Sequence, residues 1–473
     1  MELVFPHLFV PWFRSVAPYI HAHKGKTFVI GIASELIAAG RLAHFVQDLA
    51  LIHSLGIKIV LTHGFRLQVE EQLATKGHAS RFVNGIRITD EAALDAAQEA
   101  AGQLRYQIEA AFSQGLPNTP MAHAQIRVLS GNYITAKPLG IVDGVNFEQT
   151  GLVRKLDSVG IQRALEQNAI VLLSPFGFSP TGEAFNLTME DVASQAAAAL
   201  KADKLIFVTE IKGISETLAK DEQQQPTQAL TSAATAPPAP ATDEHSGILH
   251  ELSLHQAEDL LAKLPDTQQP TDAAYYLKYA VKASQNGVER VHIIPYAVDG
   301  GLLMEIFTHD GIGTMIVDEK LDSLREARSD DVGGIIQLIE PLEKDGILVK
   351  RSRTDIERDI SAYTVIEHDG VLFGCAAFYP YPQAKTGEMA ALTVLPQAQG
   401  QGDGDRLLKR IEQRARALGF ESIFVLTTRT MHWFIKRGFE PVKPEWLPEA
   451  RLKKYNWERR SQVLVKRLDR IID

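Results

Sequence analysis

The sequence has few of the features that mark disulfide-linked, zinc-binding or nucleic-acid-binding proteins. Cys375 is the only cysteine among 473 residues, which excludes a disulfide within the chain and a zinc site made of cysteines. Long runs of lysine and arginine are lacking and the formal net charge is −9, which argues against non-specific binding of nucleic acid. Pro6, Pro11 and Arg14 interrupt the apolar N-terminus, so we expect neither a signal peptide nor a membrane span there. A cytoplasmic protein is the consistent expectation.

The composition is that of a folded globular chain. Hydrophobic residues make up 45% and charged residues 23% of the sequence. The length predicts two or three domains, each large enough for its own core. Small anionic substrates remain possible, because a local pair of arginines can act inside an acidic protein.

The first three hundred residues alternate between strand-like and helix-like segments. Apolar runs occur at 27–32, 57–61, 169–173, 205–208 and 291–294, and helical patterns occur at 36–55 and 192–200. This alternation predicts an α/β domain with a mostly parallel sheet. A stretch rich in Gln, Pro, Ala and Thr lies between residues 221 and 245, and we interpret it as a mobile insertion because the same pattern resumes after it.

A glycine-rich turn between a strand and a helix is the most informative feature of the second half. The strand-like segment 388–395 leads to Gln399, Gly402 and Gly404, and the apolar positions of a helix follow at Leu407, Leu408, Ile411 and Leu418. Such a turn exposes backbone N–H groups at a helix start, where an anion is favoured. On spacing alone, a glycine-rich turn after a strand is more often a flexible connection. A dinucleotide site is disfavoured, because Glu421 begins the next strand rather than ending it.

This turn resembles the acetyl-CoA motif Q/R-x-x-G-x-G/A of the GNAT acetyltransferases. The register beginning at Gln399 is preferred, although Gln397 with Gly400 and Gly402 also fits. The flanking segments at 387–390, 426–439 and 455–457 resemble the C-terminal domain of the bacterial N-acetylglutamate synthase family. The resemblance implies acetyl-CoA contacts from the following residues: Ala391, Leu392, Thr393, Val394, Gln399, Gly400, Gln401, Gly402, Asp403 and Gly404.

Acetyl transfer from a thioester to an amine needs a base, a stabilised oxyanion and a stabilised thiolate. Glu388 is the predicted base, through a water or directly, as the resemblance also implies. The fold resemblance implies a strand bulge within 391–394 whose N–H groups hold the oxyanion. Thr427, or else Thr428, is the predicted hydrogen-bond donor to the thiolate.

The family pattern also implies arginines that hold the two carboxylates of glutamate. The chosen residues are Arg351 and Arg459, with Arg460 one register step away. No metal is expected.

The first half resembles the amino acid kinase fold, in its acetylglutamate kinase branch. The segments 25–30, 53–57, 128–132, 186–188 and 203–206 carry the resemblance. Family kinases have a lysine and paired glycines after the first strand, where this chain has Gly31, Ala33 and Ser34. A further family lysine falls on Tyr276, so we expect phosphoryl transfer to be lost.

A kinase fold that has lost phosphoryl transfer suggests a regulatory role for this part of the chain. Arginine-sensitive members have an N-terminal helix with a tyrosine and a later Glu and Gly-x-Gly-Thr segment, matched here by Tyr19, Glu305, Gly311 and Gly313. The resemblance therefore implies an allosteric arginine site, with Glu305 as the partner of the guanidinium.

These inferences combine into one prediction. We expect an α/β amino acid kinase-like regulatory domain at 1–317 with an insertion at about 216–246, a linker at 318–325, and a GNAT α+β domain at 326–473. The predicted activity is N-acetylglutamate synthesis from acetyl-CoA and L-glutamate, the first step of arginine biosynthesis, inhibited by arginine. A bifunctional synthase and kinase, or a non-catalytic sensor of CoA and arginine, stay open as alternatives. The family implies a homo-hexamer.

Overall fold

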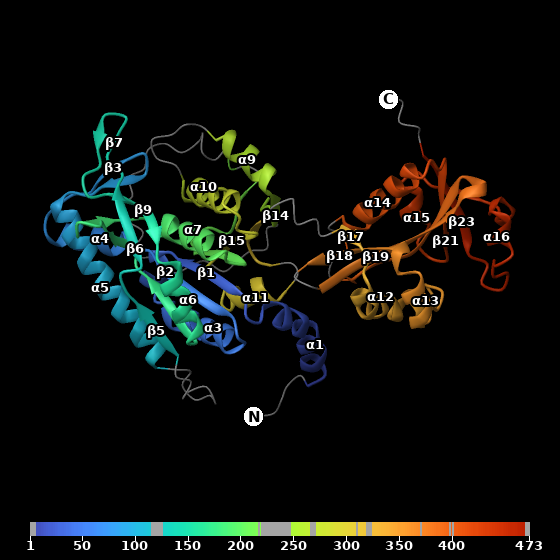
Figure 1. Ribbon diagram of the computed structural model, residues 1–473, viewed down its shortest axis with the longest axis horizontal. Coiled ribbons are helices and arrows are strands. Elements are labelled where there is room, and N and C mark those ends of the chain that lie inside the picture. Colours follow the sequence, from blue (N-terminus) through green and yellow to red (C-terminus); the bar gives the residue numbers. More distant parts are fainter. Residues whose placement is uncertain are drawn as a thin grey trace. The chain divides into compact units, whose positions relative to one another are not determined.

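The computed structural model describes residues 6–114, 126–215, 218, 247–264, 271–308, 311–317, 324–368, 371–396, 399 and 402–468. The chain divides into two compact units (Figure 1): His23–Leu321, and Met1–Ala22 together with Asp322–Asp473. We call them the kinase-like unit and the acetyltransferase unit. Most of the predicted insertion and linker lies outside the described residues.

The kinase-like unit is built on an eight-stranded sheet. Its neighbours pair in parallel except β15 and β16, which confirms the predicted mostly parallel sheet. Its order is β14 (Glu251–Ser253), β16 (Thr314–Val317), β15 (Arg290–Pro295), β13 (Lys204–Thr209), β1 (Thr27–Ile32), β2 (Lys58–His63), β10 (Ala169–Leu173) and β5 (Arg127–Ser130). The central strands are buried along nearly their whole length, as in parallel sheets that helices cover on both faces.

Helices surround this sheet. They are α2 (Ser34–Ala38), α3 (Leu42–Ser54), α4 (Arg66–Thr75), α5 (Glu91–Ser113), α6 (Ser158–Glu166), α7 (Met189–Leu200), α9 (Leu254–Ala262), α10 (Asp272–Gln285) and α11 (Gly301–Phe307). The predicted single helix over 36–55 is wrong, because α2 and α3 are separate. Gly40, with φ +71°, turns the chain between them.

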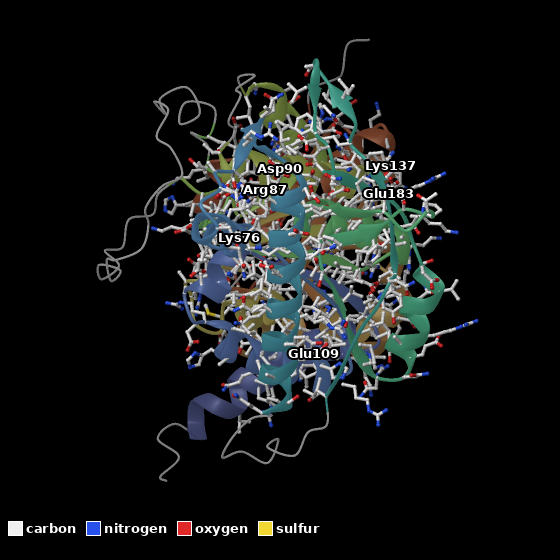
Figure 2. All side chains as sticks on the ribbon, turned by 90° about the vertical axis from the view of Figure 1, so that its left-hand side faces the viewer. Lys76, Arg87, Asp90, Glu109, Lys137 and Glu183 are labelled. Atoms are coloured by element: carbon white, nitrogen blue, oxygen red, sulfur yellow. The ribbon has the colours of Figure 1, made fainter. Side chains whose placement is uncertain are left out.

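Helix α5 illustrates how local sequence sets an element boundary. Asp90 is its N-cap, and its carboxylate accepts a hydrogen bond from Ala93 N at 3.0 Å. In Figure 2, Asp90 lies toward one end of this long helix and Glu109 toward the other. Lys76, just after α4, pairs with Glu99 of α5 at 2.9 Å, so the two helices are held together on the outside of the unit.

Smaller sheets complete the kinase-like unit. A four-stranded sheet has the order β12 (Ala184–Asn186), β11 (Phe176–Phe178), β6 (Ile134–Pro138) and β9 (Gly151–Leu156). Two short hairpins consist of β3 (Arg81–Val83) with β4 (Ile86–Ile88), and β7 (Ile141–Val142) with β8 (Val145–Asn146).

The acetyltransferase unit is built on a seven-stranded sheet. Its order is β17 (Leu324–Glu326), β18 (Tyr363–His368), β19 (Val371–Tyr381), β20 (Thr386–Val394), β21 (Ser422–Thr427), β23 (Gln462–Arg467) and β22 (Glu440–Val442). All neighbours pair antiparallel except β20 and β21, which are parallel.

Helices cover both faces of this second sheet. The core that contains Cys375 and Ala377 also contains apolar residues of α12 (Val332–Lys344) and α13 (Arg353–Arg358). The alternate residue Gly374 faces Leu407 of α14 (Asp403–Ala417), so α14 lies on the opposite face. The sequence placed Leu418 on the buried face of this helix, which is wrong. The helix ends at Ala417, and Leu418 is 57% exposed.

The remaining helices of this unit are short, apart from the N-terminal one. They are α15 (Met431–Ile435), α16 (Glu449–Leu452) and α1 (Pro6–His23), of which residues up to Ala22 belong to this unit. The ring of Tyr19 on α1 lies 6.4 Å from that of Phe373 on β19. Among the described helices, none has the length and apolar character needed to cross a membrane.

Candidate active site

Strand β20 contains a bulge at the place where the fold resemblance implied one. Thr393 pairs with Cys375 and Ala390 with Ala377, so residues 391 and 392 stand opposite the single residue Ala376. Ala391 has φ +52°, a left-handed conformation that a residue with a side chain rarely adopts. The bulge therefore redirects backbone groups of the strand, the groups to which the fold resemblance assigned oxyanion binding.

The parallel strands β20 and β21 separate beside this bulge. They are paired only over 386–388 and 422–424. Beyond that point β20 pairs only with β19, and β21 only with β23, in the part of the sheet that the structure describes. The facing edges of the two strands consequently offer backbone N–H and C=O groups that no sheet partner takes. Glu388 is the last residue of β20 that pairs with β21.

Glu388 is a buried carboxylate held by two side chains. Only 7% of it is exposed. Arg451 donates to both of its oxygens, from Nε to Oε2 at 2.6 Å and from Nη2 to Oε1 at 3.0 Å, and the Tyr381 hydroxyl lies 3.4 Å from Oε2. Burial, together with this nearby carboxylate, raises the pKa of Tyr381 to about 12. The predicted base is thus fixed in position and charge-paired.

The two candidate threonines differ in their surroundings. Thr427, the last residue of β21, is 8% exposed, and its Oγ1 lies 2.8 Å from Oγ1 of Thr430 and accepts from Thr430 N at 3.1 Å. Thr428 is exposed. Thr427 therefore has the fixed hydroxyl of the pair, on the strand that diverges from Glu388.

The glycine-rich turn leads directly into helix α14. Gly402 precedes the helix with φ +93°, and its carbonyl accepts from Asp405 N and Arg406 N. Gln399 is exposed and donates from Nε2 to Val394 O at 3.0 Å, which ties the turn to the end of β20. Gly400 and Gln401, and the alternative Gln397, lie outside the described residues.

Two ion pairs hold arginines at the first turn of α14. Asp403 is 5% exposed and pairs with Arg406 at 3.2 Å. Asp405 pairs with Arg437, which donates from Nη2 to Oδ2 at 2.7 Å. These bonds place two guanidinium groups beside a helix N-terminus, where a phosphate anion is favoured.

Trp433 packs over the same turn. The Arg437 guanidinium lies 3.8 Å from the centroid of its ring. A Cβ at position 404 would come within 3.0 Å of the ring, so a residue larger than Gly404 would push it aside.

Two of the three predicted carboxylate-binding arginines converge on one segment. Arg351 Nη1 donates to Val349 O at 3.0 Å, and Arg459 Nη2 donates to Ile347 O at 2.5 Å. Both side chains are half-buried, whereas Arg460 is exposed and has φ +50°. The structure therefore brings Arg351 and Arg459 to the same segment. Arg460 is less buried than either of them. Groups of His, Cys, Asp and Glu able to hold a metal are absent from the described part of the chain.

Three of the residues assigned to arginine binding meet in the kinase-like unit. Glu305 on α11 is 8% exposed and its Oε2 accepts from Ile312 N at 2.7 Å and Gly313 N at 3.3 Å. Gly311 has φ +59°, and a Cβ there would lie 2.6 Å from the same oxygen. These glycines therefore allow the loop to wrap around the carboxylate. Tyr19 belongs to the acetyltransferase unit.

Basic residues that the sequence did not single out surround Glu305. His292 Nδ1 lies 2.6 Å from Glu305 Oε1. Burial raises the pKa of Glu305, but the bonds from His292, Ile312 N and Gly313 N outweigh it and hold the pKa below its ordinary value. Burial lowers the pKa of the neighbouring Lys204 well below its usual range. His292 lies 13 residues from Glu305 and Arg451 lies 63 residues from Glu388, and neither separation matches a helix or strand period that could have indicated the pair.

Comparison with protein families agrees with both units. Residues 26–232 match the amino acid kinase family, and residues 334–439 match the acetyltransferase (GNAT) family. The fold and the site thus define a class of protein: a GNAT acetyltransferase unit joined to an amino acid kinase-like unit.

Relatives that match the chain over nearly its full length identify its family within this class. The chain is 56% identical to the amino-acid acetyltransferase of Ralstonia nicotianae, over 97% of this chain and 95% of that one. It is 45% identical to the amino-acid acetyltransferase of Ectopseudomonas mendocina, over 98% and 100%. The chain therefore belongs to the amino-acid acetyltransferase family and is an acyltransferase, as the sequence predicted.

Solved structures of a more distant relative match the whole chain. One is N-acetylglutamate synthase from Neisseria gonorrhoeae complexed with coenzyme A and L-arginine, with 37% identity, coverage of 98% of this chain and 100% of that chain, and a TM-score of 0.81. The same protein complexed with coenzyme A and N-acetyl-glutamate matches with a TM-score of 0.59 at the same identity and coverage. The resemblance inferred from the sequence motifs is confirmed.

Proposed function

We propose that this chain is an N-acetylglutamate synthase, which transfers the acetyl group of acetyl-CoA to the α-amino group of L-glutamate as the first step of arginine biosynthesis. The observation that carries the proposal is the buried carboxylate of Glu388 at the point where β20 and β21 separate, with the bulge of β20 directly after it. A base and unpaired backbone donors are then adjacent on one strand. The Neisseria relative, which binds coenzyme A and N-acetyl-glutamate, supports this assignment.

Each step of direct transfer has a candidate residue. Acetyl-CoA supplies an activated acetyl thioester. Glu388 takes one proton from the glutamate ammonium, directly or through a water, and the free amine then forms the C–N bond as the C–S bond breaks. The nitrogen gives up its second proton as the amide forms, and the departing CoA thiolate takes up a proton to become the thiol. Backbone N–H groups at the β20 bulge stabilise the carbonyl oxygen as negative charge develops. The Thr427 hydroxyl donates to the sulfur that leaves.

Binding of the two substrates is assigned to separate groups. The glycine-rich turn, the N-terminus of α14 and the arginines held by Asp403 and Asp405 favour the pyrophosphate of acetyl-CoA. Arg351 and Arg459, which converge on the segment 347–349, are the proposed holders of a glutamate carboxylate. Arg460 is the weaker candidate because its side chain is exposed.

We further propose that L-arginine binds at Glu305 and inhibits the enzyme. Glu305 is a buried carboxylate enclosed by Gly311 and Gly313, and an arginine guanidinium can pair with it through a charge-assisted hydrogen bond. The Neisseria relative was solved with L-arginine bound, which supports an effector site in the family.

The decisive experiment measures CoA thiol release from acetyl-CoA with L-glutamate, with and without L-arginine. L-Aspartate and L-glutamine are the matched acceptors, because one is a methylene shorter and the other lacks the second charge. We expect release with glutamate, far less with the other two, and suppression by arginine. Absence of release with glutamate contradicts the proposed activity and favours a non-catalytic sensor.

A bifunctional synthase and kinase is the second candidate, and the kinase-like unit argues against it. Tyr276, where the family resemblance places a kinase lysine, is 7% exposed with its ring 5.4 Å from that of Phe207. Met189 Sδ would lie 2.6 Å from a Cβ at Gly31, so the edge of β1 is filled by side chains. Acetylglutamate-dependent release of ADP from ATP would contradict this conclusion.

A further inference from the structure

Thr430 occupies the N-cap position of helix α15, but its hydroxyl does not cap that helix. A threonine at an N-cap usually accepts a hydrogen bond from an N–H of the first helical turn. Within the described structure its side chain makes no such bond, and Oγ1 lies instead 2.8 Å from Oγ1 of Thr427. The Thr430 hydroxyl is therefore directed toward the predicted thiolate donor rather than toward its own helix.

The hydrogen bonds around Thr427 decide what its proton can do. Its Oγ1 accepts from Thr430 N at 3.1 Å, and the Thr430 hydroxyl is close enough to donate to the same oxygen. A hydroxyl oxygen accepts two hydrogen bonds and carries one proton of its own. When Thr430 fills the second acceptor position, the proton of Thr427 is left for another acceptor, as the leaving sulfur requires.

The two hydroxyls differ in their access to water. Only 8% of Thr427 is exposed, whereas Thr430 is an exposed residue. A buried hydroxyl exchanges protons with water only through a hydrogen-bonded partner. In the described part of the chain, the Thr430 hydroxyl is the side-chain partner of Thr427.

Backbone and side-chain bonds hold Thr430 in this position. Its carbonyl accepts from Trp433 N at 3.1 Å, and the Trp433 carbonyl accepts from Nη1 of Arg437 at 3.0 Å. Arg437 Nη2 in turn donates to Asp405 on α14 at 2.7 Å. The pair of hydroxyls is thus tied to the helix whose N-terminus we assign to the pyrophosphate of acetyl-CoA.

Acid strength explains why a single hydroxyl is not enough. CoA leaves as a thiolate when the C–S bond breaks, and a threonine hydroxyl is a far weaker acid than a thiol. Thr427 alone can therefore stabilise the thiolate by a hydrogen bond but cannot give its proton away. It can do so only if another proton reaches its oxygen at the same moment, and Thr430 is placed to supply one.

We propose that Thr430 and Thr427 form a two-hydroxyl path that carries a proton from the solution to the leaving sulfur of CoA. The S–H bond forms as the O–H bond of Thr427 breaks, and Thr430 passes its proton to the Thr427 oxygen. An acid of the surrounding solution, hydronium or a protonated buffer, replaces the proton of Thr430, so both residues end as neutral hydroxyls. Thr430 acts through Thr427 and is a positioning residue. This inference rests on the proposed acetyl transfer and on the role of Thr427 in it.

The test uses the full chain with Thr430→Val, Thr430→Ser, Thr427→Val, and the two valine substitutions combined. Valine has the shape of threonine without the hydroxyl, and serine keeps the hydroxyl. Thr354→Val is the matched control, because Thr354 is an exposed threonine on α13 of the same unit. The measurements are the rate of a single turnover with enzyme in excess over acetyl-CoA, in H2O and in D2O, and KM for both substrates.

We expect Thr430→Val to lower the single-turnover rate about 3-fold to 10-fold, because a hydrogen bond that acts through Thr427 is lost. Thr430→Ser and Thr354→Val should stay within about 2-fold of the wild type, and KM should not change, because Thr430 contacts neither substrate. Adding Thr430→Val to Thr427→Val should slow the reaction no further. The slowing in D2O should be smaller in Thr430→Val than in the wild type, because fewer protons move.

Each of three results overturns the inference. A wild-type rate in Thr430→Val would remove Thr430 from the proton path. A lower rate with an unchanged effect of D2O, or with a raised KM for acetyl-CoA, would mean that Thr430 only shapes the turn. Further slowing in the Thr427→Val background would give Thr430 a role that does not pass through Thr427.

The same measurements separate this inference from the proposed function. A lower rate in Thr427→Val but not in Thr430→Val would contradict the two-hydroxyl path and leave the proposed function intact. A wild-type chain that does not acetylate glutamate would contradict the proposed function and this inference together.

Discussion

At the scale of single residues, the site depends on a carboxylate whose partners come from separate segments. Glu388 lies on β20, Tyr381 at the end of β19 and Arg451 on α16. Glutamine at position 388 keeps the size of the side chain and removes the proton acceptor. We expect Glu388→Gln to lower kcat about 100-fold or more while calorimetric affinity for CoA is retained.

The matched control for this substitution is Glu421→Gln. Glu421 is an exposed carboxylate beside β21 whose side chain pairs with Lys385. It should keep wild-type turnover. Full activity in Glu388→Gln would require another base.

Thr427 and Thr428 form a natural pair for testing the thiolate donor. Valine has the shape of threonine without the hydroxyl. Thr427→Val should lower kcat about 10-fold, because one hydrogen bond to developing charge is lost, and Thr428→Val should have little effect. Steady-state thiol release with saturating substrates measures both. The reverse order of effects would assign the role to Thr428.

At the scale of elements, the bulge of β20 makes a prediction about stability. Ala391 has φ +52°, which a β-branched side chain adopts only with strain and glycine adopts freely. Ala391→Val should lower the free energy of unfolding by about 2 kcal/mol, whereas Ala391→Gly should change it by less than about 1 kcal/mol.

Urea unfolding followed by tryptophan fluorescence measures this difference. All four tryptophans lie in the acetyltransferase unit, so the signal reports on the unit that contains the bulge. Equal destabilisation by valine and glycine would mean that packing, rather than backbone conformation, sets the cost.

Helices and strands could be predicted from the sequence where a local pattern of apolar residues determines them. The strand at 169–173 and the helix over 192–200 follow from runs of apolar residues that are buried as expected. The break between α2 and α3 was missed because the apolar period continues across Gly40. The bulge could be inferred only from the family, since it depends on the register of β20 against β19.

The site residues also fall into two groups: those that a sequence motif indicated and those that only tertiary packing brings to the site. The family motif indicated Glu388 and Thr427, which the structure places on the strands that diverge. Arg451 and His292 were missed because each meets its carboxylate only through tertiary packing, and arginine or histidine alone has no pattern that indicates a partner.

At the scale of the whole molecule, the proposed regulation links the kinase-like unit to chemistry in the other unit. Glu305→Ala should abolish inhibition by L-arginine and leave the uninhibited KM for glutamate unchanged, because the carboxylate that pairs with the effector is removed. Glu305→Gln preserves the volume and controls for loosening of the buried site.

The measurement is thiol release over a range of arginine concentrations. Glu251→Ala, at an exposed position on β14 of the same unit, is the matched control and should stay inhibited. Inhibition of Glu305→Ala equal to that of the wild type would place the effector elsewhere.

The separation of β20 and β21 also bears on how easily this enzyme could escape an inhibitor. An inhibitor that depends on side chains loses affinity when one of those side chains is exchanged. The facing edges of these strands offer backbone atoms, which every residue carries, so a compound that pairs with them as an added strand depends little on side-chain identity. Only proline deletes a backbone donor, and within β20 it would also disturb the strand that carries Glu388. An inhibitor built on these edges would therefore leave the enzyme few routes to resistance.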